Sequence, residues 1–185
     1  MRDIAGGSRS EVVLSVVPLD HRQVRDLESA HVAEMAARYG GGGPGPVHGR
    51  EFEPPDGCFV LASIGDTPVG CGGFRRLGPG VAEIKRMFVA AGARGSGVGR
   101  RVLVFLEEQA RAAGYRESWL ETGTEQPEAI ALYTSAGYRP IDPYGEFRDD
   151  ARCRCFARTL GPRVTRGHAP GRRARGGTGP SGPST

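Results

Sequence analysis

The sequence lacks any long hydrophobic run, has few cysteines and contains a single lysine. No stretch approaches the roughly 18–20 apolar residues that cross a bilayer, and the N-terminus has no apolar signal-peptide core, so we expect a cytoplasmic protein with no membrane partner. Four cysteines are too few for a disulfide scaffold, and their spacing matches no metal motif, so we expect no metal. Lys85 is the one lysine among 25 basic residues, which indicates a compositional bias of the genome.

Charge is unevenly distributed along the 185 residues, whose formal net charge is +4. Residues 161–185 contain five arginines and no acid, whereas residues 1–160 carry 20 basic and 21 acidic groups. Seven glycines and four prolines in that tail leave too little apolar surface to form a core, so residues 161–185 are predicted to be disordered. With a flexible N-terminus over 1–10, residues 11–160 have the usual size of one domain.

Hydrophobic patterning predicts a mixed α/β (α+β) domain. Proline and glycine mark the ends of the expected helices; for example, Pro127 lies at the start of one helix and Gly137 follows its end. The expected order is β-α-β-β-β-α-β-α-β-β, with a mostly antiparallel sheet and a crossover after the fourth strand. The expected strands are 12–17, 58–64, 69–75, 81–89, 118–121, 138–141 and 151–160, and the expected helices are 20–39 (with Asp20 as N-cap), 98–113 and 128–136.

A glycine-rich turn joins the strand at 81–89 to the most amphipathic helix. Glycines at 95, 97 and 99 let successive N–H groups point into one concavity, and a helix N-terminus and two arginines add positive charge there. The pattern favours binding of a phosphate or pyrophosphate. It matches neither the GxxxxGK[ST] phosphate loop nor the GxGxxG dinucleotide fingerprint. Close packing of strand on helix is the structural alternative.

The turn Arg94-Gly95-Ser96-Gly97-Val98-Gly99 resembles the [QR]-x-x-G-x-[GA] signature of the GCN5-related N-acetyltransferase (GNAT) superfamily. The segments 83–89, 120–123 and 128–138 also resemble that family's neighbouring elements, so the likeness covers residues 11–160. It implies a splayed cleft for acetyl-CoA, used as a cosubstrate. By resemblance the cofactor-binding residues are Met87, Phe88, Val89, Arg94, Gly95, Ser96, Gly97, Val98, Gly99, Arg100 and Gln126, the last standing where many members carry Asn.

The resemblance also implies catalytic roles. Tyr133 falls at the position of the acid that protonates the departing thiolate, with core packing as its alternative role. Glu83, eleven residues before Arg94, is the candidate general base for an amine, and its alternative role is an ion pair with an arginine across the sheet. A carboxylate needs a raised pKa, or a water relay, to act as that base.

The acceptor is expected between the loops 34–52 and 142–150, where Glu34, Tyr39 and Tyr144 are candidate substrate residues. Solvated loop charges are an equally good interpretation of the acids there. The sequence thus predicts acetyl transfer directly to an amine, without a covalent enzyme intermediate. A noncatalytic acyl-CoA-binding module and a nucleic-acid-binding role of the tail are the alternatives, and nothing in the sequence decides whether the chain forms a homodimer.

Overall fold

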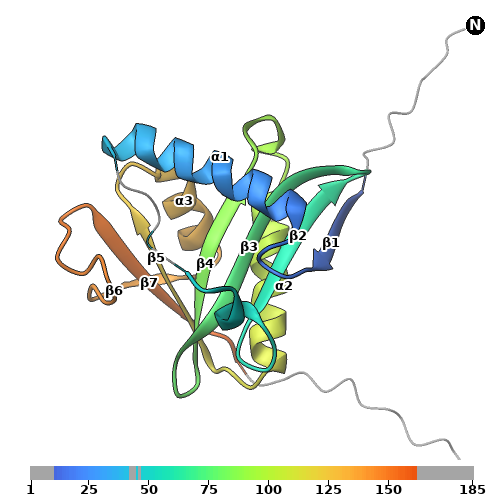
Figure 1. Ribbon diagram of the computed structural model, residues 1–185. Helices are drawn as coiled ribbons and strands as arrows, with labels where there is room; N and C mark the ends of the chain where they lie inside the picture. The colour runs from blue at the N-terminus through green and yellow to red at the C-terminus, as the bar shows by residue number, and fades with distance from the viewer. Residues whose placement is uncertain (1–10, 42–44, 46, 162–185) are drawn as a thin grey trace, which may run out of the picture.

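The structure, a computed structural model, describes residues 11–41, 45 and 47–161, and the predictions for residues 1–10 and 162–185 lie outside this range. One mixed sheet carries three α-helices and two 3₁₀ turns (Figure 1). The elements are β1 (Val12–Val16), α1 (Arg22–Tyr39), η1 (Gly49–Phe52), β2 (Cys58–Ile64), β3 (Thr67–Gly78), β4 (Val81–Val89), η2 (Ala91–Ala93), α2 (Val98–Ala112), β5 (Glu117–Gly123), α3 (Pro127–Ser135), β6 (Arg139–Ile141) and β7 (Cys153–Thr159). Their order confirms the predicted one.

The sheet follows the order β1-β2-β3-β4-β5-β7-β6. All neighbours pair antiparallel except β4 and β5, which run parallel because α2 crosses over between them. The predicted mixed, mostly antiparallel α/β fold with a crossover after the fourth strand is therefore confirmed.

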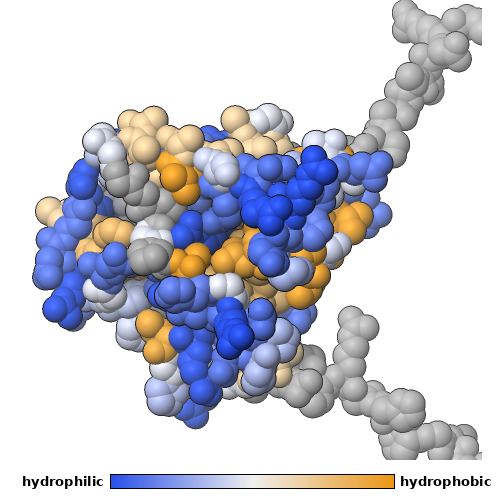
Figure 2. Space-filling view, viewed as in Figure 1, coloured by the Kyte–Doolittle hydropathy of each residue, from blue (hydrophilic) through white to orange (hydrophobic). Residues whose placement is uncertain are grey.

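Two apolar cores lie on opposite faces of the sheet because side chains alternate along each strand. Phe59 and Leu61 of β2 pack with Val24 and Leu27 of α1, whereas the intervening Val60 packs in a second cluster with α2 and α3. In Figure 1, α1 accordingly crosses in front of the sheet and α2 lies behind it. Figure 2 shows mainly hydrophilic residues on this face, interrupted by small hydrophobic patches.

The strands β4 and β5 separate before either of them ends. They pair only from Val81 opposite Glu117 to Ile84 opposite Leu120, while β4 continues to Val89. Beyond Ile84 the β5-facing edge of β4 has no strand partner in the part of the chain that the structure describes, so its main-chain groups on that edge are left for other contacts. The sheet therefore splays open at this point.

A bulge distorts β4 where the splaying begins. Gly73 of β3 pairs with Lys85 and Cys71 pairs with Phe88, so two residues of β4 stand opposite one of β3. Arg86 in this bulge has φ of 60°, a left-handed conformation that costs a non-glycine residue free energy. Bulges of this kind re-aim side chains beside functional sites.

Besides shifts of one or two residues at the ends of other elements, two local expectations differ from the structure. The N-cap of α1 is His21 rather than Asp20, and His21 makes no side-chain capping bond. Strand β3 extends from Thr67 to Gly78, beyond the predicted 69–75, because it remains paired with β4 up to the Gly78–Val81 turn. No helix in the described ranges is long and apolar enough to cross a membrane.

Candidate active site

The glycine-rich turn leads directly into α2. Gly95 and Gly97 have φ of 76° and 88°, and no atom lies within 4 Å of where a side chain would begin at either residue. In the part of the chain that the structure describes, the N–H groups of residues 95–100 make no well-formed hydrogen bond to the main chain. Gly97 also gives α2 no side-chain cap. The turn thus presents a row of free donors at a helix N-terminus, the arrangement that binds anions.

A cavity of about 380 Å³, here named the turn cavity, extends from this turn along the open edge of β4. Its wall includes Met87, Phe88, Val89, Arg94, Gly95, Gly97, Val98, Gly99, Arg100 and Gln126. All belong to the set predicted to bind the cofactor; Ser96 does not line the cavity, because its hydroxyl donates to the carbonyl of Ala93. The structure therefore brings ten of the eleven predicted residues to one surface.

Two arginines flank the turn cavity. The Arg94 guanidinium donates to the Val89 carbonyl at 3.0 Å and pairs with Glu34 at 2.5 Å, and its hydrogen bond holds the pKa of Glu34 below its usual range. Arg100 donates to the hydroxyl of Ser135. Glu34, predicted to face the acceptor, lines the turn cavity together with the residues predicted to bind the cofactor.

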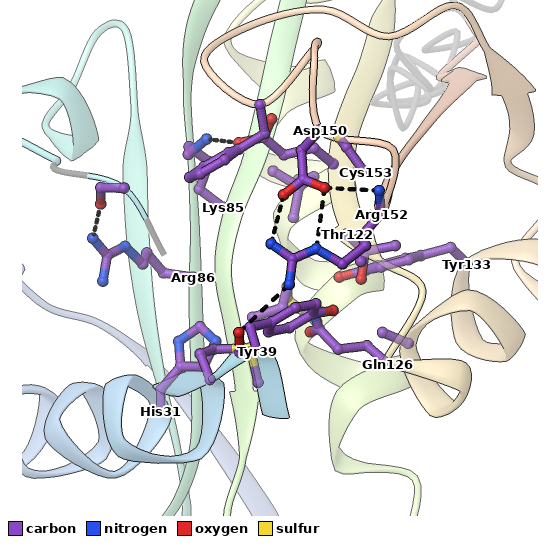
Figure 3. A pocket seen from close by; sticks show the side chains of 18 of the residues that line it. His31, Tyr39, Lys85, Arg86, Thr122, Gln126, Tyr133, Asp150, Arg152 and Cys153 are labelled. Carbon is purple, nitrogen blue, oxygen red and sulfur yellow. Dashed lines mark hydrogen bonds and ion pairs between the residues drawn. The ribbon is translucent and has the colours of Figure 1, made fainter. Parts of the chain in front are cut away.

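A second cavity of about 320 Å³, the loop cavity, lies between β4, β5 and the loop before β7 (Figure 3). It shares a set of lining residues with the turn cavity, so the two spaces adjoin. The shared residues are His31, Met35, Met87, Gln126, Ala129 and Tyr133. Molecules held in the two cavities would therefore meet at these six shared residues.

Tyr133 of α3 lies at the junction of the two cavities. Its side chain is 5% exposed, and burial raises the pKa of the phenol well above 10.0, so the hydroxyl keeps its proton. No described residue hydrogen-bonds that hydroxyl, unlike that of Tyr138 nearby, which pairs with Ser118 at 2.7 Å. The Tyr133 hydroxyl is therefore a proton donor without a hydrogen-bond partner among the described residues.

Glu83 is 2% exposed and lines neither cavity. Its carboxylate accepts from Arg75 across the β3–β4 pair at 2.8 Å and from Lys85 at 3.3 Å. This arrangement matches the structural role given to Glu83 as the alternative to a general base, which is an ion pair with an arginine across the sheet. The prediction that Glu83 is a general base stays untested.

Glu121 of β5 does line the loop cavity, and the sequence analysis assigned it no role. One carboxylate oxygen pairs with Lys85 at 2.5 Å, and the other, Oε2, is buried without a hydrogen-bond partner among the described residues. The sequence alone gives no signal for this contact, because Glu121 comes near Lys85 only through the pairing of Leu120 with Ile84 across β4 and β5. Only the parallel pairing brings these charges together.

Tyr39, at the end of α1 and predicted to be a substrate residue, lines the loop cavity. Its hydroxyl accepts from Gln126 at 3.2 Å, and Arg152 lies over its ring with the guanidinium carbon 5.3 Å from the centroid. A Cβ at Gly123 would overlap the Tyr39 hydroxyl, so only glycine permits this approach. Gln126 thus lines both cavities, although many members of the family that the sequence resembles carry Asn at this position.

Tyr144 does not line either cavity, contrary to its placement among the substrate residues. Its ring packs edge-on against Trp119 with centroids 5.2 Å apart. Burial, followed by the nearby carboxylates of Glu83 and Glu121, raises the pKa of its phenol. The residue is half-buried and its hydroxyl is buried, because the loop 142–150 packs against Trp119 of β5.

Known proteins share the sequence pattern of the chain. Residues 24–138 match the family model described as "Acetyltransferase (GNAT) family". An IAA acetyltransferase of Azospirillum brasilense is 43% identical over 97 residues, which is 52% of this chain and 63% of that protein. An uncharacterized N-acetyltransferase of Bacillus subtilis, YsnE, is 30% identical over 142 residues, 74% of this chain and 92% of that protein.

Solved structures share its fold. A candidate acyl-CoA N-acyltransferase from Klebsiella pneumoniae superposes with a TM-score of 0.72 at 24% identity, over 82% of this chain and 99% of that one. A GNAT family acetyltransferase from Elizabethkingia anophelis with acetyl-CoA bound gives a TM-score of 0.59 at 17% identity, over 80% and 97% of the two chains. With the family model covering more than half of the sequence, the chain belongs to the GNAT acetyltransferase family.

Proposed function

We propose that residues 11–160 form an N-acetyltransferase domain that moves the acetyl group of acetyl-CoA directly to a primary amine of a small molecule or peptide, without a covalent enzyme intermediate. The observation that carries this proposal is the meeting of the two cavities at Tyr133. Direct transfer requires both substrates to be present at one point, and two adjoining spaces with common walls supply that condition.

The turn cavity suits acetyl-CoA. The free N–H groups of residues 95–100 would receive the pyrophosphate, with Arg94 and Arg100 beside them. The unpaired edge of β4 over 85–89 would receive the pantetheine arm, since its N–H and C=O groups can pair like those of a missing strand. An N–H on this edge would also hold the thioester oxygen while charge develops on it.

The reaction needs two proton movements. The amine nitrogen forms a bond to the carbonyl carbon of the thioester while the carbon–sulfur bond breaks, so the amine must lose a proton and the sulfur must gain one. Tyr133 would donate to the sulfur, because its hydroxyl lies at the junction and its raised pKa keeps it protonated. For the amine we favour Glu121 over Glu83, since Glu121 lines the loop cavity and has an oxygen without a partner.

The proposal is tested by a thiol-release assay with acetyl-CoA and a panel of amines, amino acids and peptides. Release of CoA together with a product 42 Da heavier than the amine is expected, the mass change being that of an acetyl group replacing hydrogen. Tight acetyl-CoA binding with no turnover of any amine would contradict the proposal and favour a noncatalytic acyl-CoA-binding module. The same panel run after deletion of residues 162–185 shows whether the basic tail affects turnover.

A further inference from the structure

The charged side chains that line the loop cavity are all paired within the protein. Lys85 pairs with Glu121 at 2.5 Å and Arg152 pairs with Asp150 at 3.0 Å, so four of the five charged residues in the lining neutralise one another. The fifth, Arg86, pairs at 2.6 Å with Glu28, which lies outside the lining. Among the described residues, the cavity therefore offers a ligand no charged group that still needs a partner.

Arg152 is the most exposed of the three cations and is also held the most tightly. Two of its guanidinium nitrogens donate to the two carboxylate oxygens of Asp150, a two-point contact that is visible in Figure 3. The guanidinium also lies over the Tyr39 ring and donates to the Tyr39 carbonyl at 3.5 Å. A charged ligand would have to displace Asp150 before it could pair with Arg152.

The uncharged part of the wall is mainly apolar and aromatic. Its large side chains are Met35, Tyr39, Ile84, Met87, Tyr133 and Phe147. Aromatic rings and the flexible thioether of methionine pack well against apolar molecules of different shapes. The loop cavity is therefore suited to an apolar body.

The turn cavity differs from the loop cavity in its free charge. Arg100 lines only the turn cavity, where its guanidinium donates to the Ser135 hydroxyl and has no acid partner among the described residues. The free N–H groups of residues 95–100 lie in the same turn. Positive charge is thus available where the phosphates of the donor are proposed to bind, and the adjoining loop cavity is neutral.

A neutral, apolar wall selects among amines. An acceptor with a second charge would give up the water around that charge without gaining a partner, and this costs binding free energy. The reacting amine is in a different position, because it must be uncharged to attack. Burial disfavours the ammonium form and lowers the pKa of an amine, so the same wall favours the nucleophile.

We infer that the acceptor of this acetyltransferase is a small primary amine whose remaining part is uncharged and apolar. That part occupies the loop cavity, and the nitrogen lies at the wall shared by the two cavities, beside Tyr133. The nitrogen bonds to the carbonyl carbon, the carbon–sulfur bond breaks, and one proton leaves the nitrogen while one reaches the sulfur, which gives an N-substituted acetamide and CoA. The inference rests on the proposed function and narrows its substrate class.

The test compares acceptors that differ only at the end far from the reacting amine. Hexylamine, 1,6-diaminohexane and 6-aminohexanoate share one chain length and end in a methyl group, an ammonium and a carboxylate. We expect kcat/KM for hexylamine to exceed both others about tenfold or more. The series is repeated with chains of four and eight carbons. A charged member that reacts as well as the alkylamine at every length would overturn the inference and leave the acetyltransferase proposal intact.

Variants of the full chain test the charge of the wall. Phe147 lines only the loop cavity, and Phe147→Glu adds an acid there. The ratio of kcat/KM for hexylamine to that for 1,6-diaminohexane should fall about tenfold or more. Phe147→Gln is similar in size to Phe147→Glu but uncharged, so it should keep the preference for hexylamine. An unchanged ratio in Phe147→Glu would overturn the inference.

Val32→Glu is the matched control for the added charge. Val32 is 42% exposed on α1 and lines neither cavity, so this variant should keep the full ratio. An equal fall of the ratio in Val32→Glu would show that the net charge of the domain selects the acceptor, and this would overturn the role of the wall. The Kd for CoA, which is proposed to bind in the turn cavity, should be the same in all three variants and shows that each is folded.

Calorimetric titration of the three hexyl compounds into the CoA-bound protein separates this inference from the chemistry. Tighter binding of hexylamine than of either charged compound, without turnover, would uphold the ligand class and contradict acetyl transfer. Turnover with no preference for hexylamine in binding or rate would do the reverse. Absence of both turnover and selective binding at every chain length would overturn the inference.

Discussion

The rings of Tyr133 and Tyr138 lie 5.8 Å apart in one core, yet of the two hydroxyls only that of Tyr138 has a hydrogen-bond partner within residues 11–41, 45 and 47–161. Tyr133→Phe removes a hydroxyl that pairs with nothing in the described protein and that faces the junction of the cavities. We expect kcat to fall by about 10² or more, the usual contribution of a positioned acid, with the Kd for acetyl-CoA unchanged. Steady-state thiol release and calorimetry measure the two quantities.

Tyr138→Phe is the matched control, because it removes the same atom from the neighbouring ring. It breaks the bond to Ser118 and should lower the free energy of unfolding by about 1 kcal/mol without changing kcat. Equal losses of kcat in both variants would show that Tyr133 acts only through packing.

The pH dependence of kcat follows from the same side chain. An acid works while it is protonated, and burial raises the pKa of Tyr133 above its usual 10.0, so the protonated form persists to higher pH. We therefore expect kcat to show no descending limb caused by Tyr133 between pH 7 and about pH 10. A descending limb in that range that disappears in Tyr133→Phe would contradict the raised pKa.

Substitution of the turn glycine Gly97 tests the anion site. Alanine has room there, but φ of 88° costs an L-residue about 1 kcal/mol or more, so the turn will relax and its N–H groups will lose their alignment. Gly97→Ala should weaken CoA binding about tenfold in calorimetry, equivalent to about 1.4 kcal/mol. Gly92→Ala, in the same segment with open space and no left-handed φ, should bind CoA like the unaltered chain.

Glu83 and Glu121 can be told apart by parallel variants. Glu83→Ala leaves Arg75 and Lys85 without their buried acid, and we expect the free energy of unfolding to fall by about 3 kcal/mol. Glu121→Gln should instead lower kcat/KM for the amine by about 10², with a smaller effect on denaturation by urea.

The conservative Glu83→Gln separates a structural acid from a general base. If Glu83 has only the structural role, this variant keeps the rising acid-side limb of the pH–rate profile. Loss of that limb in Glu83→Gln, together with normal activity in Glu121→Gln, would restore the general-base prediction for Glu83.

The paired thiols of Cys153 and Cys155 should resist alkylation. Their sulfurs lie 3.7 Å apart and both residues are buried; burial, with the neighbouring thiol, raises the pKa of Cys153 to about 12. At pH 8 only about one Cys153 in 10⁴ would be thiolate, the form that reacts. Mass spectrometry after iodoacetamide treatment should find this pair modified in urea and unmodified in the native chain, and rapid native modification would contradict the described burial.

The order of elements could be predicted because its signals are local. The bounds of each element follow from apolar runs, from Pro127 and from the glycines that end helices. The glycine pattern within residues 94–100 is by itself enough to predict an anion site. Most residues that line the turn cavity could be listed together for the same reason, since they form nearly one continuous segment from the end of β4 into α2.

The loop cavity could not be predicted because its residues meet only through long-range pairing. Arg86 adopts a left-handed conformation in a bulge, and the sequence has no glycine at this position to indicate it. Glu121 contacts Lys85 only because β5 lies parallel to β4. The position of Glu34 in the wall of the turn cavity could not be predicted for a related reason. Its placement depends on an ion pair with Arg94, 60 residues away in the chain.

The short contact between β4 and β5 has a mechanical consequence. Four residue pairs, from Val81 to Ile84 on β4, join the strands β1–β4 to the strands β5–β7 within the sheet. A donor molecule lying along the open edge would act as an eighth strand that bridges the two halves. Bound CoA should therefore stiffen the whole domain, and hydrogen exchange should slow in β5 and β7 as well as in the turn that holds the phosphates.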